Sequence, residues 1–237
     1  MTLQLKKLKP FAQGGNRLCF VHPQNPERCI KVRRPDFTLA DCRRKKGFPK
    51  NLRPLSYFDD NREEFRVMVG LERSYGESLF QHASRCYGFE ASDMGKGLVS
   101  ELIKDRNGRI SQTLKKYIWD YGMTGAVQEA VRSLADFWLT ECIPSRDLLL
   151  HNIVVQMSGE QIKRLVVIDG LGSSGLVSSR MFPPLFLRRK AQRRVDNLYN
   201  RIDLLLSQRG SGDFPGFHGE LFHDGLPEAM TKAAGTE

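Results

Sequence analysis

Hydrophobic and polar positions divide the chain into a first part that is typical of strands and a second part that is typical of helices. Short apolar runs bounded by turn residues predict four strands, over residues 5–12, 18–21, 28–33 and 98–103. A glycine turn at 13–16 and a His-Pro turn at 22–26 separate the first three strands. The polar turn at 104–108 is the expected boundary between two lobes.

Apolar residues at helical spacing predict three helices, over residues 61–74, 124–141 and 185–206. Asn61 is the expected N-cap of the first, with Glu64 at its third position as in a capping box. A hairpin is expected over 152–156 and 163–168. Residues 34–60 lack periodicity and are expected to form a mobile connection, and the glycine- and proline-rich segment 208–237 a loosely ordered tail.

Composition indicates an ordinary soluble protein with one domain or two small lobes, because 40% of the 237 residues are hydrophobic and 27% are charged. The net charge of +10 favours anionic partners: nucleotides, nucleic acid or an acidic membrane surface. Five scattered cysteines without a C-x-x-C pair argue against a zinc site or a disulfide framework and favour a reducing compartment. The sequence contains no transmembrane segment by length of apolar run, and the N-terminus does not resemble a signal peptide. We expect a cytoplasmic protein.

Lys31 is the first candidate for chemistry, because a cation between Ile30 and Val32 in a strand is costly unless it is paired or faces a ligand. This pattern is typical of the kinase lysine that contacts nucleotide phosphates. Glu64 on the following helix is the expected partner of Lys31, with Glu63 as its rival. The alternative is that Lys31 extends to solvent from an edge strand.

Two glycines precede this strand, and their backbone N–H groups are candidates for covering phosphates. Gly14 and Gly15 lie between two predicted strands, where N–H groups can bind anions. The full G-x-G-x-x-G motif is absent, so a plain hairpin turn is the competing interpretation.

The segment Ser145-Arg146-Asp147-Leu148-Leu149-Leu150-His151-Asn152 matches much of the kinase pattern H-R-D-L-x-x-x-N. Asp147 is the candidate that orients an acceptor hydroxyl, and Asn152 a candidate metal ligand. Asp169 ends an apolar strand and is the second candidate ligand, since carboxylate and amide oxygens suit Mg²⁺. Taken singly, Asp147 could be an ordinary loop residue and Asp169 part of a turn before Gly170. Their order after Lys31 favours the phosphoryl-transfer interpretation.

Two basic groups, at 43–46 and 188–190, have a competing explanation as solvated faces. The second follows the apolar run 182–187, an arrangement that suits an interfacial helix and peripheral contact with the inner membrane. Nucleic acid is a disfavoured partner, because no aromatic residues interleave the basic runs.

Several of these segments resemble the bacterial YrbL / PhoP regulatory network protein family. The resemblance rests on residues 15–23, with their His-Pro turn, and on 27–32, with the Arg-Cys-Ile-Lys strand. It continues through Glu64, 147–152, Asp169 and 187–190. It implies an α+β, two-lobed, protein-kinase-like fold with a small β-rich N-lobe at 1–103, containing one key helix, and a mainly α C-lobe at 104–207. It also implies ATP as cofactor, with the adenine edge near Glu101 to Ile103.

The sequence departs from protein kinases in three respects. Ser145 replaces the usual His, Asp169 is followed directly by Gly170, and no Ala-Pro-Glu motif is present. These departures favour a compact ATP- and Mg²⁺-dependent phosphotransferase acting on a hydroxyl of a small molecule, sugar or envelope glycan. The alternative is a pseudokinase regulator linked to PhoP-type envelope or magnesium-stress signalling.

Overall fold

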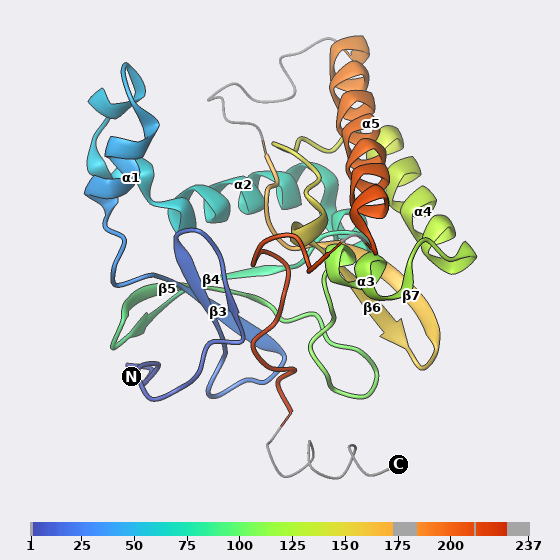
Figure 1. The fold of residues 1–237 in the computed structure, drawn as a ribbon. Coiled ribbons are helices and arrows are strands. Elements are labelled where there is room, and N and C mark those ends of the chain that lie inside the picture. Colours follow the sequence, from blue (N-terminus) through green and yellow to red (C-terminus); the bar gives the residue numbers. More distant parts are fainter. Residues whose placement is uncertain (1, 173–183, 211, 227–237) are drawn as a thin grey trace. The chain divides into compact units, whose positions relative to one another are not determined.

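A computed structural model of the chain describes residues 2–172, 184–210 and 212–226 (Figure 1). The chain forms two compact units. Unit 1 comprises Met1–Val69, Arg85–Leu102 and Leu221–Glu237, and unit 2 comprises Gly70–Ser84 and Ile103–Glu220. The described part combines antiparallel sheets with five α-helices, which confirms the predicted α+β class.

An antiparallel sheet with the order β1-β2-β3-β5-β4 forms the centre of unit 1. Its strands are β1 (Ala12–Gln13), β2 (Arg17–Val21), β3 (Arg28–Arg33), β4 (Cys86–Ser92) and β5 (Gly95–Glu101). Side chains alternate between the two faces of a strand. Ile30 and Val32 join Leu3, Leu5, Phe20 and Val99 in a buried cluster. The intervening Lys31 therefore points to the opposite face, which is the placement that its mid-strand position predicts.

The predicted strand over residues 5–12 was wrong. Only Ala12 and Gln13 pair in the sheet, opposite Cys19 and Leu18. Upstream, the Oδ1 atom of Asp93 accepts hydrogen bonds from the backbone N–H groups of Leu5 at 2.7 Å and Lys6 at 3.3 Å. The carboxylate of Asp93 thus takes backbone N–H groups that would otherwise pair with a neighbouring strand, and the pairing of β1 with β2 does not extend to Leu5 and Lys6.

The connection at 34–60 contains more regular structure than its composition indicates. Helix α1 (Leu39–Lys46) and the short 3₁₀ turns η1 (Lys50–Leu52) and η2 (Leu55–Phe58) lie within it. Thr38 and Asp41 form a capping box, in which each side chain accepts from the backbone N–H of the other residue. Cys42 is the one buried residue of α1, so the sequence shows little hydrophobic periodicity over this helix. The capping box therefore marks the start of α1 more clearly than any apolar pattern does.

Helix α2 (Asp60–Tyr75) confirms the predicted helix, but its N-cap prediction was wrong. The Oδ1 atom of Asp59 accepts from the N–H groups of Asn61 at 3.2 Å and Arg62 at 3.4 Å, so Asp59 caps the helix. Asn61 lies one position inside the helix and uses its side chain elsewhere.

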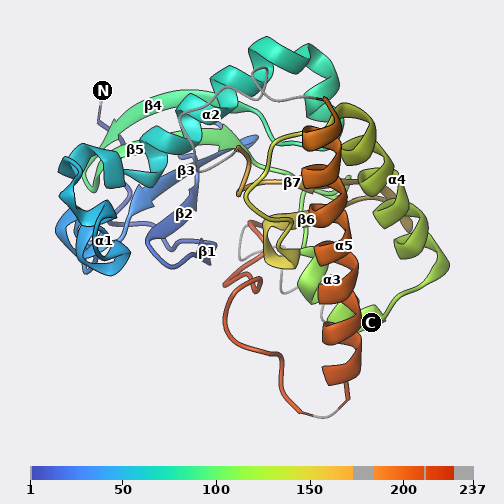
Figure 2. The same ribbon diagram turned by 90° about the horizontal axis from the view of Figure 1, so that it is seen from above.

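The described part of unit 2 contains the end of α2, three further α-helices, two 3₁₀ turns and a β-hairpin. Its other elements are η3 (Gly76–Gln81), α3 (Leu114–Tyr121), α4 (Gly125–Glu141), η4 (Leu150–Asn152), β6 (Ile153–Ser158), β7 (Gln161–Val167) and α5 (Pro184–Gln208). Both α3 and α4 pack against α5 (Figure 2). The predicted hairpin and the two later helices are confirmed to within a few residues, because long apolar stripes mark them. Helix α3 was not predicted.

The described part of the C-terminal segment makes specific contacts in each unit. In unit 2, the Oγ1 atom of Thr113 donates to the carbonyl of Gly219 at 2.6 Å, and Lys115 donates to the carbonyl of His218 at 3.1 Å. In unit 1, the N–H of Phe222 donates to the carbonyl of Phe11 at 2.8 Å. In the part of the chain that the structure describes, no helix has the length and apolarity needed to cross a membrane.

Gly97 is expected to be essential for packing in the unit 1 sheet. A Cβ atom at this position would lie 2.4 Å from Cγ1 of Ile30 and 2.9 Å from Cγ1 of Val32. Gly97→Ala should therefore lower the free energy of unfolding by about 1–3 kcal/mol, as overpacking does. Gly70→Ala is the matched control, since its Cβ would meet open space within a helix and should stabilise by about 0.5–1 kcal/mol. Equal urea midpoints for Gly97→Ala and the parent protein would contradict this account.

Candidate functional site

In unit 1 the predicted pairing of Lys31 with Glu64 is present. The Nζ atom of Lys31 lies 2.7 Å from Oε1 of Glu64, and the two side chains are only 8% and 14% exposed. β3 supplies the lysine and α2 the glutamate. Glu63, the rival partner, lies one position away on α2, and the ion pair of Lys31 is with Glu64.

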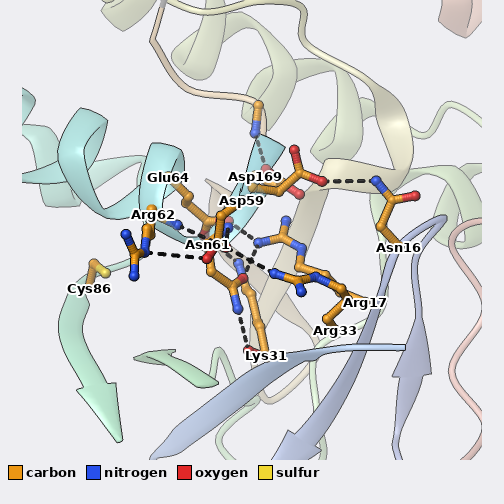
Figure 3. A network of polar contacts seen from close by, with 12 residues as sticks. Asn16, Arg17, Lys31, Arg33, Asp59, Asn61, Arg62, Glu64, Cys86 and Asp169 are labelled. Carbon is orange, nitrogen blue, oxygen red and sulfur yellow. Dashed lines mark hydrogen bonds and ion pairs between the residues drawn. The ribbon is translucent and has the colours of Figure 1, made fainter. Parts of the chain in front are cut away.

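Arg17 and Asn61, which the sequence analysis did not assign to the site, extend the network around this ion pair (Figure 3). Arg17 on β2 contacts Oε2 of Glu64 and donates to Oδ1 of Asn61 at 3.0 Å. Asn61 in turn donates through Nδ2 to the backbone carbonyl of Lys31 at 2.9 Å. Glu64 is therefore held by two cations, and its position relative to β3 is fixed from both sides. Strand alternation was a usable signal for Arg17, because it places Arg17 and Cys19 on the face of the sheet that carries Lys31.

Burial makes this network unlike a surface ion pair. A cation removed from water must be compensated by a close anion, and breaking such a pair leaves an uncompensated charge. The same face of the sheet carries Cys29, where burial raises the pKa of the thiol to about 12, so this side chain remains a neutral thiol. A lysine held in this setting presents a fixed positive charge suited to binding a phosphate or another anion.

The other unit 1 residues predicted to bind the cofactor have backbone partners in the structure. The N–H of Gly14 donates to the carbonyl of Arg17 at 2.9 Å and closes the turn, and the carbonyl of Gly15 accepts from Arg34 at 3.4 Å. Glu101 ends β5, and its carboxylate accepts from the N–H of Arg85 at 3.0 Å. Contact of Gly14, Gly15 and Glu101 with a nucleotide stays a prediction. Ile103 belongs to unit 2, where its carbonyl accepts from the N–H of Ser111 at 3.0 Å.

In unit 2 the structure brings Asp147, Asn152 and Asp169 together around Gly170. The N–H of Gly170 donates to Oδ1 of Asp169 at 2.6 Å, and its carbonyl accepts from the N–H of Arg146 at 2.9 Å. A Cβ at Gly170 would lie 3.2 Å from the carbonyl oxygen of Asp147 and 3.4 Å from Nδ2 of Asn152. Gly170 also has a positive φ of 84°, a conformation that favours glycine. This glycine lets the two loops approach each other.

The oxygen atoms of Asn152 and Asp169 are chemically suited to a hard cation such as Mg²⁺. Among the described residues, no three His, Cys, Asp or Glu side chains form a group that could hold a metal. An ion bound by Asn152 and Asp169 would therefore take its remaining ligands from water or from phosphate oxygens, as Mg²⁺ usually does.

Asp147 has a partner that sequence analysis missed. Its Oδ2 atom accepts from Nη2 of Arg201 on α5 at 2.5 Å, and its Oδ1 atom accepts from the N–H of Leu148 at 3.1 Å. Each carboxylate oxygen has a second acceptor position, so a hydroxyl can still donate to Asp147. Ser145, two residues earlier, is buried and its Oγ atom accepts from Nε1 of Trp138 at 3.2 Å. Ser145 therefore anchors this loop to α4.

Two histidines in unit 2, the buried His82 and the half-buried His151, have lowered pKa values and are neutral near neutral pH. Burial lowers the pKa of His151 to about 4, and its ring stacks on His218 with the centroids 5.2 Å apart. Burial also lowers the pKa of His82, and its Nδ1 atom lies 2.9 Å from the carbonyl of Leu165. Because a carbonyl can only accept, Nδ1 of His82 carries the proton.

We expect His82 to make stability depend on pH. A histidine with a lowered folded-state pKa binds fewer protons in the folded than in the unfolded chain, so stability falls as the pH decreases below about 6.5. His82→Asn removes this titration and retains an amide donor. Urea unfolding at several pH values should show a smaller loss of stability between pH 7.5 and 5 for the variant. An unchanged pH dependence would contradict the assignment.

Comparison with known proteins connects these residues to a family. The sequence model of the family described as PhoP regulatory network protein YrbL matches residues 3–203. The chain belongs to the YrbL family. A protein named uncharacterized protein YrbL, from Escherichia coli strain K12, is 23% identical over 196 residues, which cover 81% of this chain and 83% of the relative. The YrbL protein of Shigella flexneri matches equally well. The YrbL match spans Lys31, Glu64, Asp147 and Asp169.

Proposed function

We propose that this protein is an ATP- and Mg²⁺-dependent phosphotransferase with a two-lobed, protein-kinase-like fold. Its acceptor would be a hydroxyl of a small molecule, sugar or envelope glycan. The observation that carries the proposal is the Lys31–Glu64 ion pair, a buried lysine on a central strand held at 2.7 Å by a glutamate of the following long helix. The family match supports a role connected with the PhoP regulatory network and leaves the reaction open.

Each proposed role follows from charge and chemistry. Lys31 would neutralise the α- and β-phosphates, and Gly14 and Gly15 would cover them. Mg²⁺, held by Asn152 and Asp169, would stabilise the charge that develops on the phosphates. Backbone groups near Glu101 and Ile103 would meet the adenine edge.

The proposed reaction transfers the γ-phosphoryl group to the acceptor hydroxyl. The bond between the γ-phosphorus and the bridging β,γ-oxygen breaks, and a bond from the acceptor oxygen to phosphorus forms. Asp147 would orient the hydroxyl and accept its proton. ADP leaves with the electron pair of the broken bond.

The sequence around Asp147 and Asp169 favours a small-molecule or glycan acceptor over a protein acceptor. Asp169 is followed directly by Gly170, and the sequence has no Ala-Pro-Glu motif, so the usual peptide-binding activation segment is not recognisable. Ser145 occupies the place of the usual histidine and is used as a buried anchor for the loop.

Turnover tests the proposal. Purified protein with millimolar ATP and Mg²⁺ should release ADP, at least slowly with water as acceptor, and Lys31→Met and Asp169→Asn should abolish the release. Glu72→Gln is the control and should keep the rate, because Glu72 is an exposed residue of the same helix as Glu64. ADP release that persists unchanged in Lys31→Met and Asp169→Asn would refute the proposal.

One observation favours a second function, that of a nucleotide-binding pseudokinase regulator. The carboxylate of Asp147 is already paired with Arg201, so one of its oxygen atoms has a protein partner before any acceptor arrives. A regulator of this kind would bind ATP and release no ADP. In that case Asp147→Asn would leave the cellular phenotype unchanged, whereas an enzyme would lose it.

A further inference from the structure

Helix α5 carries a strong excess of positive charge. Its 25 residues contain six basic and two acidic side chains, namely Arg188, Arg189, Lys190, Arg193, Arg194, Arg201, Asp196 and Asp203. One face of the helix is buried through Ala191, Val195, Leu198, Ile202 and Leu205. The basic residues are consequently distributed over the remaining faces, and their positions on the helix decide what each can contact.

Lys190, Arg194 and Arg201 lie on one flank of α5. Arg194 follows Lys190 by four residues, and Arg201 follows Arg194 by seven. On a helix with 3.6 residues per turn, these spacings place the three side chains at nearly the same angle around the helix axis. Arg193 lies about 100° away from Arg194 and is exposed. The flank of Lys190, Arg194 and Arg201 is therefore distinct from the outer face that carries Arg193.

This flank lies along the loop that carries Asp147. The Nε atom of Arg194 donates to the carbonyl of Ser145 at 3.2 Å, and Nη2 of Arg201 donates to Oδ2 of Asp147. Arg201 is itself held by a bond from Nη1 to the carbonyl of Asn197 at 3.1 Å. Two guanidinium groups of α5 are thus fixed on the loop that carries the residue proposed to orient the acceptor.

The charges of these groups are not equally compensated. Arg201 has a carboxylate partner in Asp147. Arg194 is half-buried, and within the described residues its side chain meets a neutral carbonyl and forms no ion pair. A guanidinium has five N–H donors in a planar fork that matches a phosphate or carboxylate, so one bond to Ser145 leaves capacity for an anion. Lys190 lies one turn earlier, with its Nζ atom 4.7 Å above the ring of Phe186.

We infer that the acceptor is itself anionic and that this flank of α5 is its recognition site. Arg194 and Lys190 bind a phosphate or carboxylate group that the acceptor carries near its reacting hydroxyl. Arg201 is a positioning residue that holds Asp147 toward that hydroxyl. This inference rests on the proposed function for the identity of the acceptor, whereas the anion site itself can be measured without turnover.

The competing explanation is that α5 merely has a solvated basic surface. Such a surface would attract any anion through total charge, and each basic residue would contribute about equally. A built site would depend on Arg194 and Lys190 and be insensitive to Arg193. Arg194→Gln and Arg193→Gln are therefore a matched pair, since both remove one charge from the same turn of the same helix.

Binding of glycerol 3-phosphate, with glycerol as the neutral control, tests the inference. Isothermal titration of the full chain is carried out at physiological salt, with and without saturating Mg²⁺ and ADP. It should show saturable binding of glycerol 3-phosphate and no binding of glycerol. Arg194→Gln and Lys190→Gln should each weaken it about tenfold, which corresponds to about 1.4 kcal/mol, and Arg193→Gln by less than about twofold. In a turnover assay, Arg194→Gln should raise KM for the acceptor and leave KM for ATP unchanged.

Vesicles containing phosphatidylglycerol present the same phosphate chemistry on a lipid. The protein should then co-sediment with these vesicles, and glycerol 3-phosphate should compete with this binding. If Arg194→Gln weakens the vesicle binding as well, the site is assigned a lipid-linked acceptor. Absence of saturable binding under both nucleotide conditions, or an equal loss in Arg193→Gln and Arg194→Gln, would overturn the inference. A protein that binds the probe as expected but neither binds nor hydrolyses ATP would refute the proposed function and leave the anion site standing.

Discussion

Glu64→Ala should destabilise the protein far more than Lys31→Met. Removing Glu64 leaves the side chains of Lys31 and Arg17, which are 8% and 14% exposed, without their shared anion. Loss of one partner from a buried pair costs about 3–5 kcal/mol. Lys31→Met instead replaces the buried cation with an apolar chain of similar length, and Glu64 keeps Arg17 as its partner. We expect that variant to lie within about 1 kcal/mol of the parent.

Urea unfolding of the two variants measures this asymmetry directly. Glu72→Ala is the control at an exposed position of the same helix and should change the unfolding free energy by less than about 0.5 kcal/mol. Equal losses in Glu64→Ala and Lys31→Met would show that Arg17 does not share the charge of Glu64. The comparison also has a functional use, because a stable Lys31→Met protein allows a loss of nucleotide binding to be interpreted without concern for folding.

Asp147→Asn should lower the rate of phosphoryl transfer by about 10²–10⁴-fold, the usual contribution of a general base. Affinity for ATP should stay within about threefold, because in the proposed mechanism Asp147 contacts the acceptor and not the nucleotide. Stability should change little. Arg201 is 34% exposed and can be solvated, and the amide oxygen of Asn can take the place of the carboxylate oxygen that accepts from Leu148.

Single-turnover transfer of the γ-phosphoryl group measures the chemical step for Asp147→Asn. Asp136→Asn, an exposed position on α4, is the control and should transfer at the parent rate. A parent-like rate in Asp147→Asn would remove Asp147 from the chemistry and favour the pseudokinase interpretation.

The sequence was most predictive where one residue pattern determines one structure. Alternation of side chains placed Lys31 opposite the buried pair Ile30 and Val32, and long apolar stripes located α4 and α5. The partner Glu64 followed from its place on the next helix, and Gly170 marked the turn after Asp169. These are local or periodic features, which a single sequence records directly.

Long-range contacts account for most of what was missed. Arg201 lies 54 residues after Asp147, and Arg17 lies 47 residues before Glu64. A basic residue on a helix surface looks the same in sequence whether it faces water or a carboxylate. The strand over 5–12 failed for a related reason, because Asp93, 88 residues after Leu5, takes the backbone donors that pairing would use.

The Arg201–Asp147 pair links the proposed chemistry to the inferred acceptor. A neutral acceptor would bring a hydroxyl to a carboxylate already balanced by a guanidinium, and would leave the charge of Arg194 uncompensated. An acceptor with its own phosphate or carboxylate would compensate Arg194 and leave Arg201 to hold Asp147 in place. Specificity for anionic over neutral acceptors would then arise from α5 and not from the loop that does the chemistry.

The central claim is that ATP binds through Lys31 with Mg²⁺ held by Asp169, and isothermal titration with ATP in Mg²⁺ and in EDTA tests it most directly. We predict that ATP binds the parent protein in a Mg²⁺-dependent manner and that Lys31→Met weakens this binding by at least about tenfold. In Asp169→Asn the dependence of ATP binding on Mg²⁺ should be lost. The absence of ATP binding by the folded parent protein, or binding that neither variant alters, would contradict the account.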